Sequence, residues 1–167
     1  MKIKYLTEKP TQTKKIGEIL AKEIFKTRIE KRALILGLEG DLGGGKTTFL
    51  QGFAKGLGIK EKITSPTFVI IKRFQVPSRN EAETNQRSST PCSMFHDFYH
   101  IDCYRIRKPK EIFNLGLKEI ISNPRNIVAI EWADRIKKIL SKNVLSLKFG
   151  FVGKTSRKIT IQSKNVQ

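Results

Sequence analysis

The sequence has few cysteines, few acidic residues and no long apolar stretch, and each shortage excludes a class of protein. Its two cysteines, Cys92 and Cys103, are too few for a disulfide scaffold, so we expect both to be reduced. No run of about 18 apolar residues is present, and the N-terminus lacks the apolar segment of a secretory signal. We therefore expect a cytoplasmic protein without a membrane segment. With 167 residues, the chain is most simply one domain, 1–167, with a sizeable core.

The shortage of acidic residues gives the chain a strong positive charge. There are 15 Asp and Glu against 33 Lys and Arg, a net charge of +18, and such a field attracts polyanions. The C-terminal region from Arg135 to Gln167 contains no acid. Its basic residues are Arg135, Lys137, Lys138, Lys142, Lys148, Lys154, Arg157, Lys158 and Lys164. A contact with nucleic acid or with an acidic protein would explain this region, and so would a general lysine bias spread over solvated faces.

One stretch matches a phosphate-binding loop. Residues 40–47, Gly-Asp-Leu-Gly-Gly-Gly-Lys-Thr, fit G-x-x-x-x-G-K-[ST] without a gap. An apolar run of strand length at 33–38 precedes them, and residues 48–57 can continue as a helix. The strand, the glycine-rich turn and the helix therefore follow in the order that a P-loop needs.

Each residue type in this loop has a physical task. Glycines allow backbone conformations with positive φ, so that successive N–H groups can cradle an anion at the helix N-terminus. The glycines expected to do so are Gly40, Gly43, Gly44 and Gly45. Lys46 is then expected beside the β- and γ-phosphates of a nucleotide, and the Thr47 hydroxyl on the Mg²⁺ that bridges them.

The remaining apolar patterns predict alternating strands and helices without an internal repeat. The first helix should be capped by Thr11 or Thr13 and should bury the stripe Ile16, Ile19, Leu20 and Ile24. Polar residues from about 75 to 95 predict an exposed, mobile insertion. Strands are predicted at 3–6, 68–71, 98–105 and 126–130, helices at 109–121 and 134–140, and a terminal hairpin from 144–149 and 157–161.

Two carboxylates come at or near the ends of apolar strands. Asp102 lies near the end of the strand at 98–105, and Glu131 directly follows the apolar run at 127–130. Parallel strands deliver such acids to one edge of a sheet, where P-loop proteins place their Mg²⁺ or water-activating groups. An ordinary strand-end Glu is the alternative for Glu131.

Three further features have structural alternatives. The turn Ser65-Pro66-Thr67 is stiff and carries hydroxyls, as a phosphate-sensing switch would, but it is also common turn chemistry. Strand alternation places His100 on the same face as Asp102, although a satisfied core or edge histidine explains it equally. Cys92, His96, His100 and Cys103 have the ligand types of a zinc site, but on a strand His100 and Cys103 would point to opposite faces.

The motifs taken together resemble the TsaE family, also called YjeE. They are Gly-Asp-Leu-Gly-x-Gly-Lys-Thr-Thr, Ser-Pro-Thr-Phe, Tyr-His-x-Asp-x-Tyr-Arg and Glu-Trp, in that order, and the resemblance covers about residues 3–161. It implies a single α/β, P-loop NTPase-like domain with a mixed central sheet flanked by helices. It also implies an ATPase, weak alone and dependent on the partners TsaD and TsaB. That family works in the bacterial machinery that forms threonylcarbamoyladenosine at position 37 of tRNAs reading codons that start with A.

The resemblance implies a role for individual residues at the matching positions. It makes Lys46, Asp102 and Glu131 catalytic and places Thr47, Glu131 and Asp102 around Mg²⁺, leaving open how the two carboxylates divide their duties. It also makes 65–67 a switch-like loop. The residues implied to bind ATP are Asp41, Leu42, Gly43, Gly44, Gly45, Lys46, Thr47, Thr48, Thr67 and Trp132. Two departures are the length of the 75–95 insertion and Cys103, which stands where an aliphatic residue is more usual.

Two other functions are compatible with the same P-loop. A small-molecule kinase would need substrate-binding arginines in a lid, and the 75–95 insertion has only Arg79 and Arg87. A non-catalytic module would use ATP only to gate docking on a partner, or binding of tRNA through the basic C-terminal region. For an ATPase, no arginine finger is identifiable within the chain beyond Arg105, so a partner could supply it.

Overall fold

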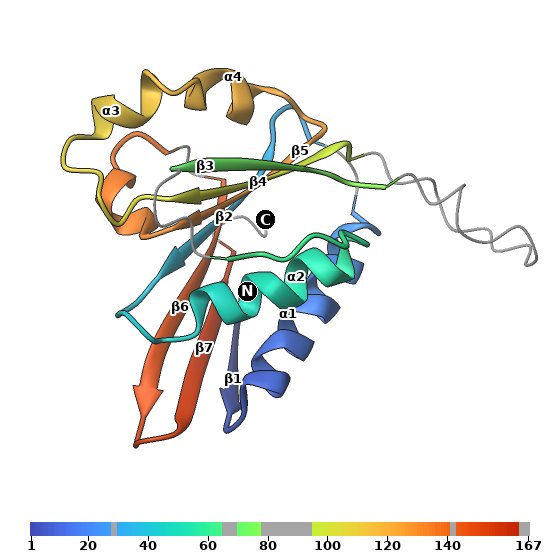
Figure 1. Ribbon diagram of the computed structural model, residues 1–167, viewed down its shortest axis with the longest axis vertical. Coiled ribbons are helices and arrows are strands. Elements are labelled where there is room, and N and C mark those ends of the chain that lie inside the picture. The colour runs from blue at the N-terminus through green and yellow to red at the C-terminus, as the bar shows by residue number, and fades with distance from the viewer. Residues whose placement is uncertain (28–29, 65–69, 78–94, 141–142, 164–167) are drawn as a thin grey trace, which may run out of the picture.

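A mixed seven-stranded sheet with helices on both faces forms the molecule (Figure 1). The structure is a computed structural model that describes residues 1–27, 30–64, 70–77, 95–140 and 143–163. Its strands are β1 (Lys2–Thr7), β2 (Leu34–Glu39), β3 (Ile71–Gln75), β4 (Asp97–Asp102), β5 (Asn126–Glu131), β6 (Val144–Val152) and β7 (Ser156–Gln162). Its helices are α1 (Pro10–Ile24), α2 (Lys46–Gly56), α3 (Pro109–Phe113), α4 (Leu117–Ser122) and the 3₁₀ helix η2 (Ala133–Ile136).

The strand order brings the predicted acids to one edge. The order is β1-β7-β6-β2-β5-β4-β3, with β6, β2, β5 and β4 mutually parallel and the outer pairs antiparallel. The predicted α/β class with a mixed sheet is therefore confirmed. Because β4 and β5 are parallel neighbours, Asp102 and Glu131 are partners in register at their C-terminal ends. The P-loop follows the C-terminal end of β2, which pairs with β5, so the loop and both acids meet.

Alternating side chains of the central strands enter two cores. Leu36 and Ala129 belong to the core under α1 and α2, whereas Ile35 and Val128 belong to the core under α3, α4 and η2. All four are almost fully buried. Strands covered on both faces lack an apolar–polar alternation, which is why 33–38 and 126–130 are near-continuous apolar runs in the sequence.

The first helix buries most of the predicted stripe, since Ile24 is buried and Ile16 and Leu20 are partly buried against the core, but it also buries small residues that were not predicted. Its buried residues are Thr13, Gly17, Ala21 and Ile24, while Ile19 is 49% exposed. Gly17 is buried by a very close approach of α2, because a Cβ on it would overlap the backbone oxygen of Phe49. Small residues therefore occupy the contact, and a search for large apolar side chains overlooks them.

The predicted cap of this helix is also wrong. The N-cap is Lys9, with Pro10 in the first turn, and the Gln12 side chain accepts hydrogen bonds from the backbone N–H groups of Glu8 and Lys9. Pro10 suits the first turn because it has no N–H to satisfy. Thr13 is buried instead, with its Oγ1 2.9 Å from Oγ1 of Thr7.

Several predicted boundaries also differ. The helix predicted at 109–121 is two helices, because Gly116 takes a φ of 83° between α3 and α4. Strand β3 begins at Ile71, β4 ends at Asp102, and the helix predicted at 134–140 is η2. Gln75 belongs to β3 and Phe95 is buried, whereas most of the predicted insertion, 78–94, lies outside the described residues.

None of the helices in the described ranges combines the length and the apolar character needed to cross a membrane.

The contact between α1 and α2 predicts an unusual response to mutation. A Cβ on Gly52 would overlap the carbonyl group of Lys14, so Gly52→Ala should lower the free energy of unfolding by about 1–3 kcal/mol. Helix propensity alone predicts the opposite sign, since Ala is favoured over Gly by about 1 kcal/mol. Thermal unfolding of the purified variant measures the difference. Gly150→Ala is the control, since its Cβ would meet nothing within 4 Å, and an unchanged or higher Tm for Gly52→Ala would contradict the prediction.

Candidate functional site

The loop between β2 and α2 has the backbone of an anion-binding turn. Gly40, Gly43 and Gly45 have φ values of 137°, 73° and 98°. Gly44 was predicted to share this property and does not, since it is absent from the glycines with positive φ. Gly45 is the N-cap of the 11-residue α2, so the loop ends where the partial positive charge of the helix N-terminus is concentrated.

Lys46 lies folded across this loop. Its Nζ donates hydrogen bonds to the carbonyl oxygens of Gly40, at 2.7 Å, and Asp41, at 2.9 Å. It also lies 4.0 Å from the centre of the Trp132 ring, a cation–π contact. Burial lowers the pKa of the ammonium group, although the nearby carboxylates of Glu131, Asp102, Asp41 and Asp134 oppose this shift. The lysine is thus held at the loop by groups that a bound anion would replace.

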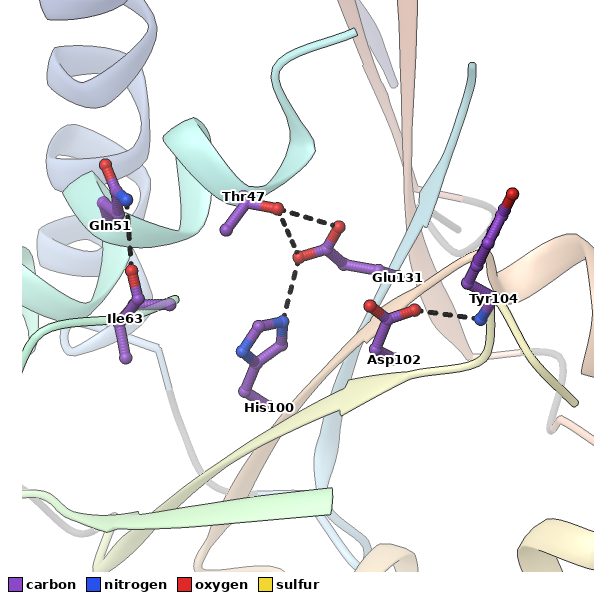
Figure 2. A network of polar contacts seen from close by, with 7 residues as sticks. All are labelled: Thr47, Gln51, Ile63, His100, Asp102, Tyr104 and Glu131. Atoms are coloured by element: carbon purple, nitrogen blue, oxygen red, sulfur yellow. Dashed lines mark hydrogen bonds and ion pairs between the residues drawn. The ribbon is translucent and has the colours of Figure 1, made fainter. Parts of the chain in front are cut away.

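Glu131 connects three elements through its buried carboxylate (Figure 2). The side chain, at the end of β5, belongs to a residue that is only 3% exposed. Thr47 in the first turn of α2 donates to its Oε1 and Oε2, at 2.9 and 3.1 Å. His100 of β4 places Nε2 2.9 Å from Oε1. A carboxylate buried in this way needs such donors to offset its lost hydration.

Asp102 ends the neighbouring strand. Its Oδ1 accepts a hydrogen bond of 2.9 Å from the backbone N–H of Tyr104 and so fixes the turn after β4 (Figure 2). Tyr104 then places its ring 5.1 Å from that of Trp132. Trp132 has a φ of 59° and a ψ of 42°, and is the one residue other than glycine with positive φ among those described. A left-handed backbone at a bulky residue is strained, and such strain is concentrated at functional sites.

These groups enclose a cavity of about 310 Å³. Its lining residues are Leu42, Gly43, Gly45, Lys46, Thr47, Thr48, Asp102, Tyr104, Glu131 and Trp132. Most of the residues predicted for ATP and Mg²⁺ are thus brought together. Asp41 and Gly44 belong to the loop without lining the cavity, and Thr67, with the rest of 65–69, lies outside the described residues. Two larger hollows, of about 510 and 460 Å³, lie away from the P-loop and contain none of these groups.

Sequence reasoning missed two contributions to this site. Tyr104 lines the cavity and stacks on Trp132, and His100 contacts Glu131 directly. The alternation of β4 placed His100 on the same face as Asp102, but did not identify its partner, because the pairing of β4 with β5 spans about 30 residues of sequence.

The residues present fit a magnesium ion that is shared with a phosphate ligand. In the described ranges, no group of three or more His, Cys, Asp or Glu could hold a metal unaided. Mg²⁺ needs no such group, because it commonly takes one or two protein oxygens and completes its shell with phosphates and water. The Thr47 hydroxyl and the Glu131 carboxylate lie in contact, and the Asp102 carboxylate lines the same cavity.

Comparison with known proteins identifies the family. A family model described as threonylcarbamoyl adenosine biosynthesis protein TsaE matches residues 7–159. The chain belongs to the TsaE family. It is 35% identical over 158 residues to the tRNA threonylcarbamoyladenosine biosynthesis protein TsaE of Bacillus subtilis, covering 95% of this chain and 84% of that protein. The protein of the same name from a Nostoc species is 40% identical over 131 residues, which is 75% of this chain and 69% of the relative.

A solved structure supports the same assignment. The crystal structure of YdiB from Bacillus subtilis matches 99% of this chain and 87% of its own, with a TM-score of 0.69 and 30% identity. The resemblance to the TsaE family, inferred from the sequence motifs, is therefore confirmed. The family's name assigns it to the formation of threonylcarbamoyladenosine in tRNA.

The basic C-terminal region of this TsaE family member lies partly around the P-loop. Nε of Arg157 donates to the carbonyl oxygen of Gly43 at 3.3 Å, and the Arg157 guanidinium lies over the ring of Phe151. Lys137 and Lys148 lie 4.0 and 3.6 Å from the Glu39 carboxylate. Lys142 and Lys164 lie outside the described residues. Several positive charges of this region therefore contribute to the surroundings of the loop.

Cys103 is a buried free thiol. The residue lies just beyond the end of β4 and is 0% exposed. Burial raises the pKa of the thiol to about 12, and the nearby Asp102 carboxylate adds to the rise. The zinc alternative also required Cys92, which lies outside the described residues.

This raised pKa predicts very slow alkylation of Cys103 in the native protein. A pKa of about 12 in place of 9.0 lowers the thiolate fraction at pH 8 by about 1,000-fold, and the thiolate is the reacting form. In the variant Cys92→Ser, where Cys103 is the remaining thiol, iodoacetamide labelling followed by mass spectrometry should be that much slower than in urea. Comparable rates in buffer and in urea would contradict the burial of this thiol.

Proposed function

We propose that this protein is the ATP-binding and ATP-hydrolysing subunit of the machinery that forms threonylcarbamoyladenosine at position 37 of tRNAs reading codons that start with A. The observation that carries the proposal is the contact of Thr47, in the first turn after a P-loop, with the buried carboxylate of Glu131. The membership of the TsaE family supports the pathway, and the acid-lined cavity supports nucleotide chemistry. We propose TsaB and TsaD as its partners and the cytoplasm as its location.

Nucleotide binding would begin with an exchange of hydrogen bonds at Lys46. Its ammonium group now bonds to the carbonyl oxygens of Gly40 and Asp41, and phosphate oxygens are stronger acceptors because they are charged. The backbone N–H groups from Gly43 to Thr48 would hold the phosphates at the N-terminus of α2. Trp132 and Tyr104 would contribute aromatic surface at the rim of the cavity.

The two carboxylates suit the remaining tasks. Mg²⁺, when bound, would neutralise charge on the phosphates, and Thr47, Glu131 and Asp102 are the residues that would hold it. Glu131 is buried and fixed by donors from two elements, which suits a group that orients the attacking water or a metal ligand. Asp102 is less buried and is fixed by the N–H of Tyr104. The chain's residues thus act mainly by positioning and by charge stabilisation.

The isolated protein should hydrolyse ATP slowly. The cavity lining contains no arginine among the described residues, and P-loop enzymes that lack an arginine finger are slow. Arg105, the candidate from the sequence, is exposed and does not line the cavity. Arg135 instead lies 5.7 Å from the Trp132 ring and 5.4 Å from the Tyr104 ring. We therefore propose that TsaB or TsaD completes the charge stabilisation, and that the basic C-terminal region is a candidate for contact with tRNA.

Measurement of Mg²⁺-dependent ATP hydrolysis tests this function. We expect low activity for the protein alone, a rise when TsaB and TsaD are added, and loss in Lys46→Ala, which removes the charge beside the phosphates. The rate of phosphate release is measured for the protein alone, for the protein with TsaB and TsaD, and for Lys46→Ala. Efficient transfer of phosphate to a small molecule without partners would instead favour the kinase alternative.

The variant Glu131→Gln distinguishes catalysis from nucleotide-gated docking. It keeps the size of the side chain but removes its charge, so we expect ATP to bind while hydrolysis falls by about 100-fold or more. Equilibrium nucleotide binding, single-turnover hydrolysis and threonylcarbamoylation of tRNA in the reconstituted system give the three readouts. Glu39→Gln is the matched control, because Glu39 also ends a central strand but does not line the cavity. Full tRNA modification without hydrolysis would support gating alone.

A further inference from the structure

His100 is a polar residue placed where no solvent reaches it. It lies on β4 between the partly buried Tyr99 and the buried Ile101, and is itself 0% exposed. Its Nε2 lies 2.9 Å from Oε1 of Glu131, a residue that is itself 3% exposed. Buried polar side chains are costly unless their hydrogen bonds are satisfied, so the contact calls for an explanation.

The hydrogen-bond pattern assigns the proton of this pair. Thr47 Oγ1 donates to both carboxylate oxygens, so Glu131 acts as the acceptor. A carboxylate has no proton to give, and Nε2 must therefore carry the hydrogen that lies between it and Oε1. The other ring nitrogen, Nδ1, has no hydrogen-bond partner within the described part of the chain. One of the two ring nitrogens is thus satisfied and the other is not.

This half-satisfied arrangement is a poor device for stability. An apolar side chain of similar size would fill the same space without a buried, unpaired ring nitrogen, although Glu131 would then lose one donor. His100 instead restrains the Glu131 carboxylate from a second side. Oε1 receives donors from both Thr47 and His100, at 2.9 Å each, so the carboxylate is held between α2 and β4 and its rotation is blocked.

The two donors to Glu131, Thr47 and His100, have different roles in the proposed chemistry. Thr47 is also the residue expected to meet Mg²⁺, so its hydroxyl has a second task in the loaded protein. His100 does not line the cavity and has Glu131 as its contact there. It can therefore hold the carboxylate in the same orientation with and without a nucleotide.

We propose that His100 is a positioning residue, which orients the Glu131 carboxylate through Nε2–H so that its free lone pairs face the metal and phosphate side of the cavity. The inference rests on the proposed function for the identity of the ligand, MgATP or MgADP. It assigns to the histidine of the Tyr-His-x-Asp-x-Tyr-Arg stretch a task distinct from core packing. Groups that hold a metal-site carboxylate from behind commonly contribute about 10- to 100-fold to metal affinity or activity.

Two substitutions at His100 separate positioning from packing. His100→Gln retains an N–H donor near the place of Nε2, whereas His100→Leu fills the space and removes the donor. Asn126→Leu is the control, because Asn126 is a 2% exposed polar residue at the opposite end of β5 from Glu131. Calorimetric titration of each protein with ADP, once in excess Mg²⁺ and once in EDTA, isolates the part of the affinity that depends on the metal. Thermal unfolding and single-turnover hydrolysis complete the comparison.

We expect His100→Leu to bind ADP in EDTA as the unsubstituted protein does, but to lose about 10- to 100-fold of its affinity in Mg²⁺ and of its hydrolysis rate. Its Tm should fall only slightly, because the loss of one donor to Glu131 is partly offset by the removal of the unpaired Nδ1. His100→Gln should recover most of the loss, and Asn126→Leu should show no such loss of metal-dependent affinity. Equal binding by all variants in Mg²⁺ would overturn the proposal, and so would equal losses of metal-dependent affinity in His100→Leu and His100→Gln.

Failure of the proposed function gives a different result. If the unsubstituted protein binds MgADP but does not hydrolyse ATP, alone or with its partners, hydrolysis is excluded while the binding comparison still decides the role of His100. If it binds no adenine nucleotide under either condition, the proposed function and the inference that rests on it are both wrong.

Discussion

The burial of the Glu131 carboxylate is the constraint on which the site depends. A charged oxygen pair taken out of water must be met by donors, and the fold supplies them from two sides, Thr47 and His100. These donors stand on α2 and on β4, so they are available only if β5 lies beside β4 and α2 begins near the end of β5. The carboxylate of Glu131 can therefore be satisfied only with this order of strands. Its hydrogen bonds also link α2, the helix that follows the P-loop, to the sheet.

Contacts of Lys46 within the chain hold its side chain at the P-loop. Its charge is shared between two loop carbonyl groups and the face of Trp132, and burial makes that charge less favourable than in water. A phosphate would replace acceptors of partial charge with acceptors of full charge, which is a gain for a poorly solvated cation. The left-handed backbone of Trp132 is maintained by the surrounding packing and keeps this ring next to the lysine. The loop is thus organised in advance, and binding need only exchange partners.

Features that depend on residues close together in the sequence were predicted well. Residues 33–57 gave the strand, loop and helix, because glycine spacing and apolar runs are local properties. Contacts between distant segments were harder to predict. Gly17 allows the close approach of α1 and α2, which a pattern of large apolar residues does not reveal, and Gly116 divides a helix that periodicity alone would continue. His100 could be assigned to a face but not to a partner, since the register of β4 against β5 is fixed by the whole sheet.

The pairing of β1 also bears on the order in which the sheet can form. Strand β1 is the first of the described strands along the chain but pairs with β7, the last of them, in a register that joins Lys2 to Gln162. Before β7 is in place, β1 lacks its neighbour in the sheet, while α1 and α2 can already pack together. The closing hairpin of β6 and β7 also brings Arg157 to the carbonyl group of Gly43. The pairing of β7 therefore completes this side of the sheet and the surroundings of the phosphate loop together, so that a chain without β7 in place lacks both.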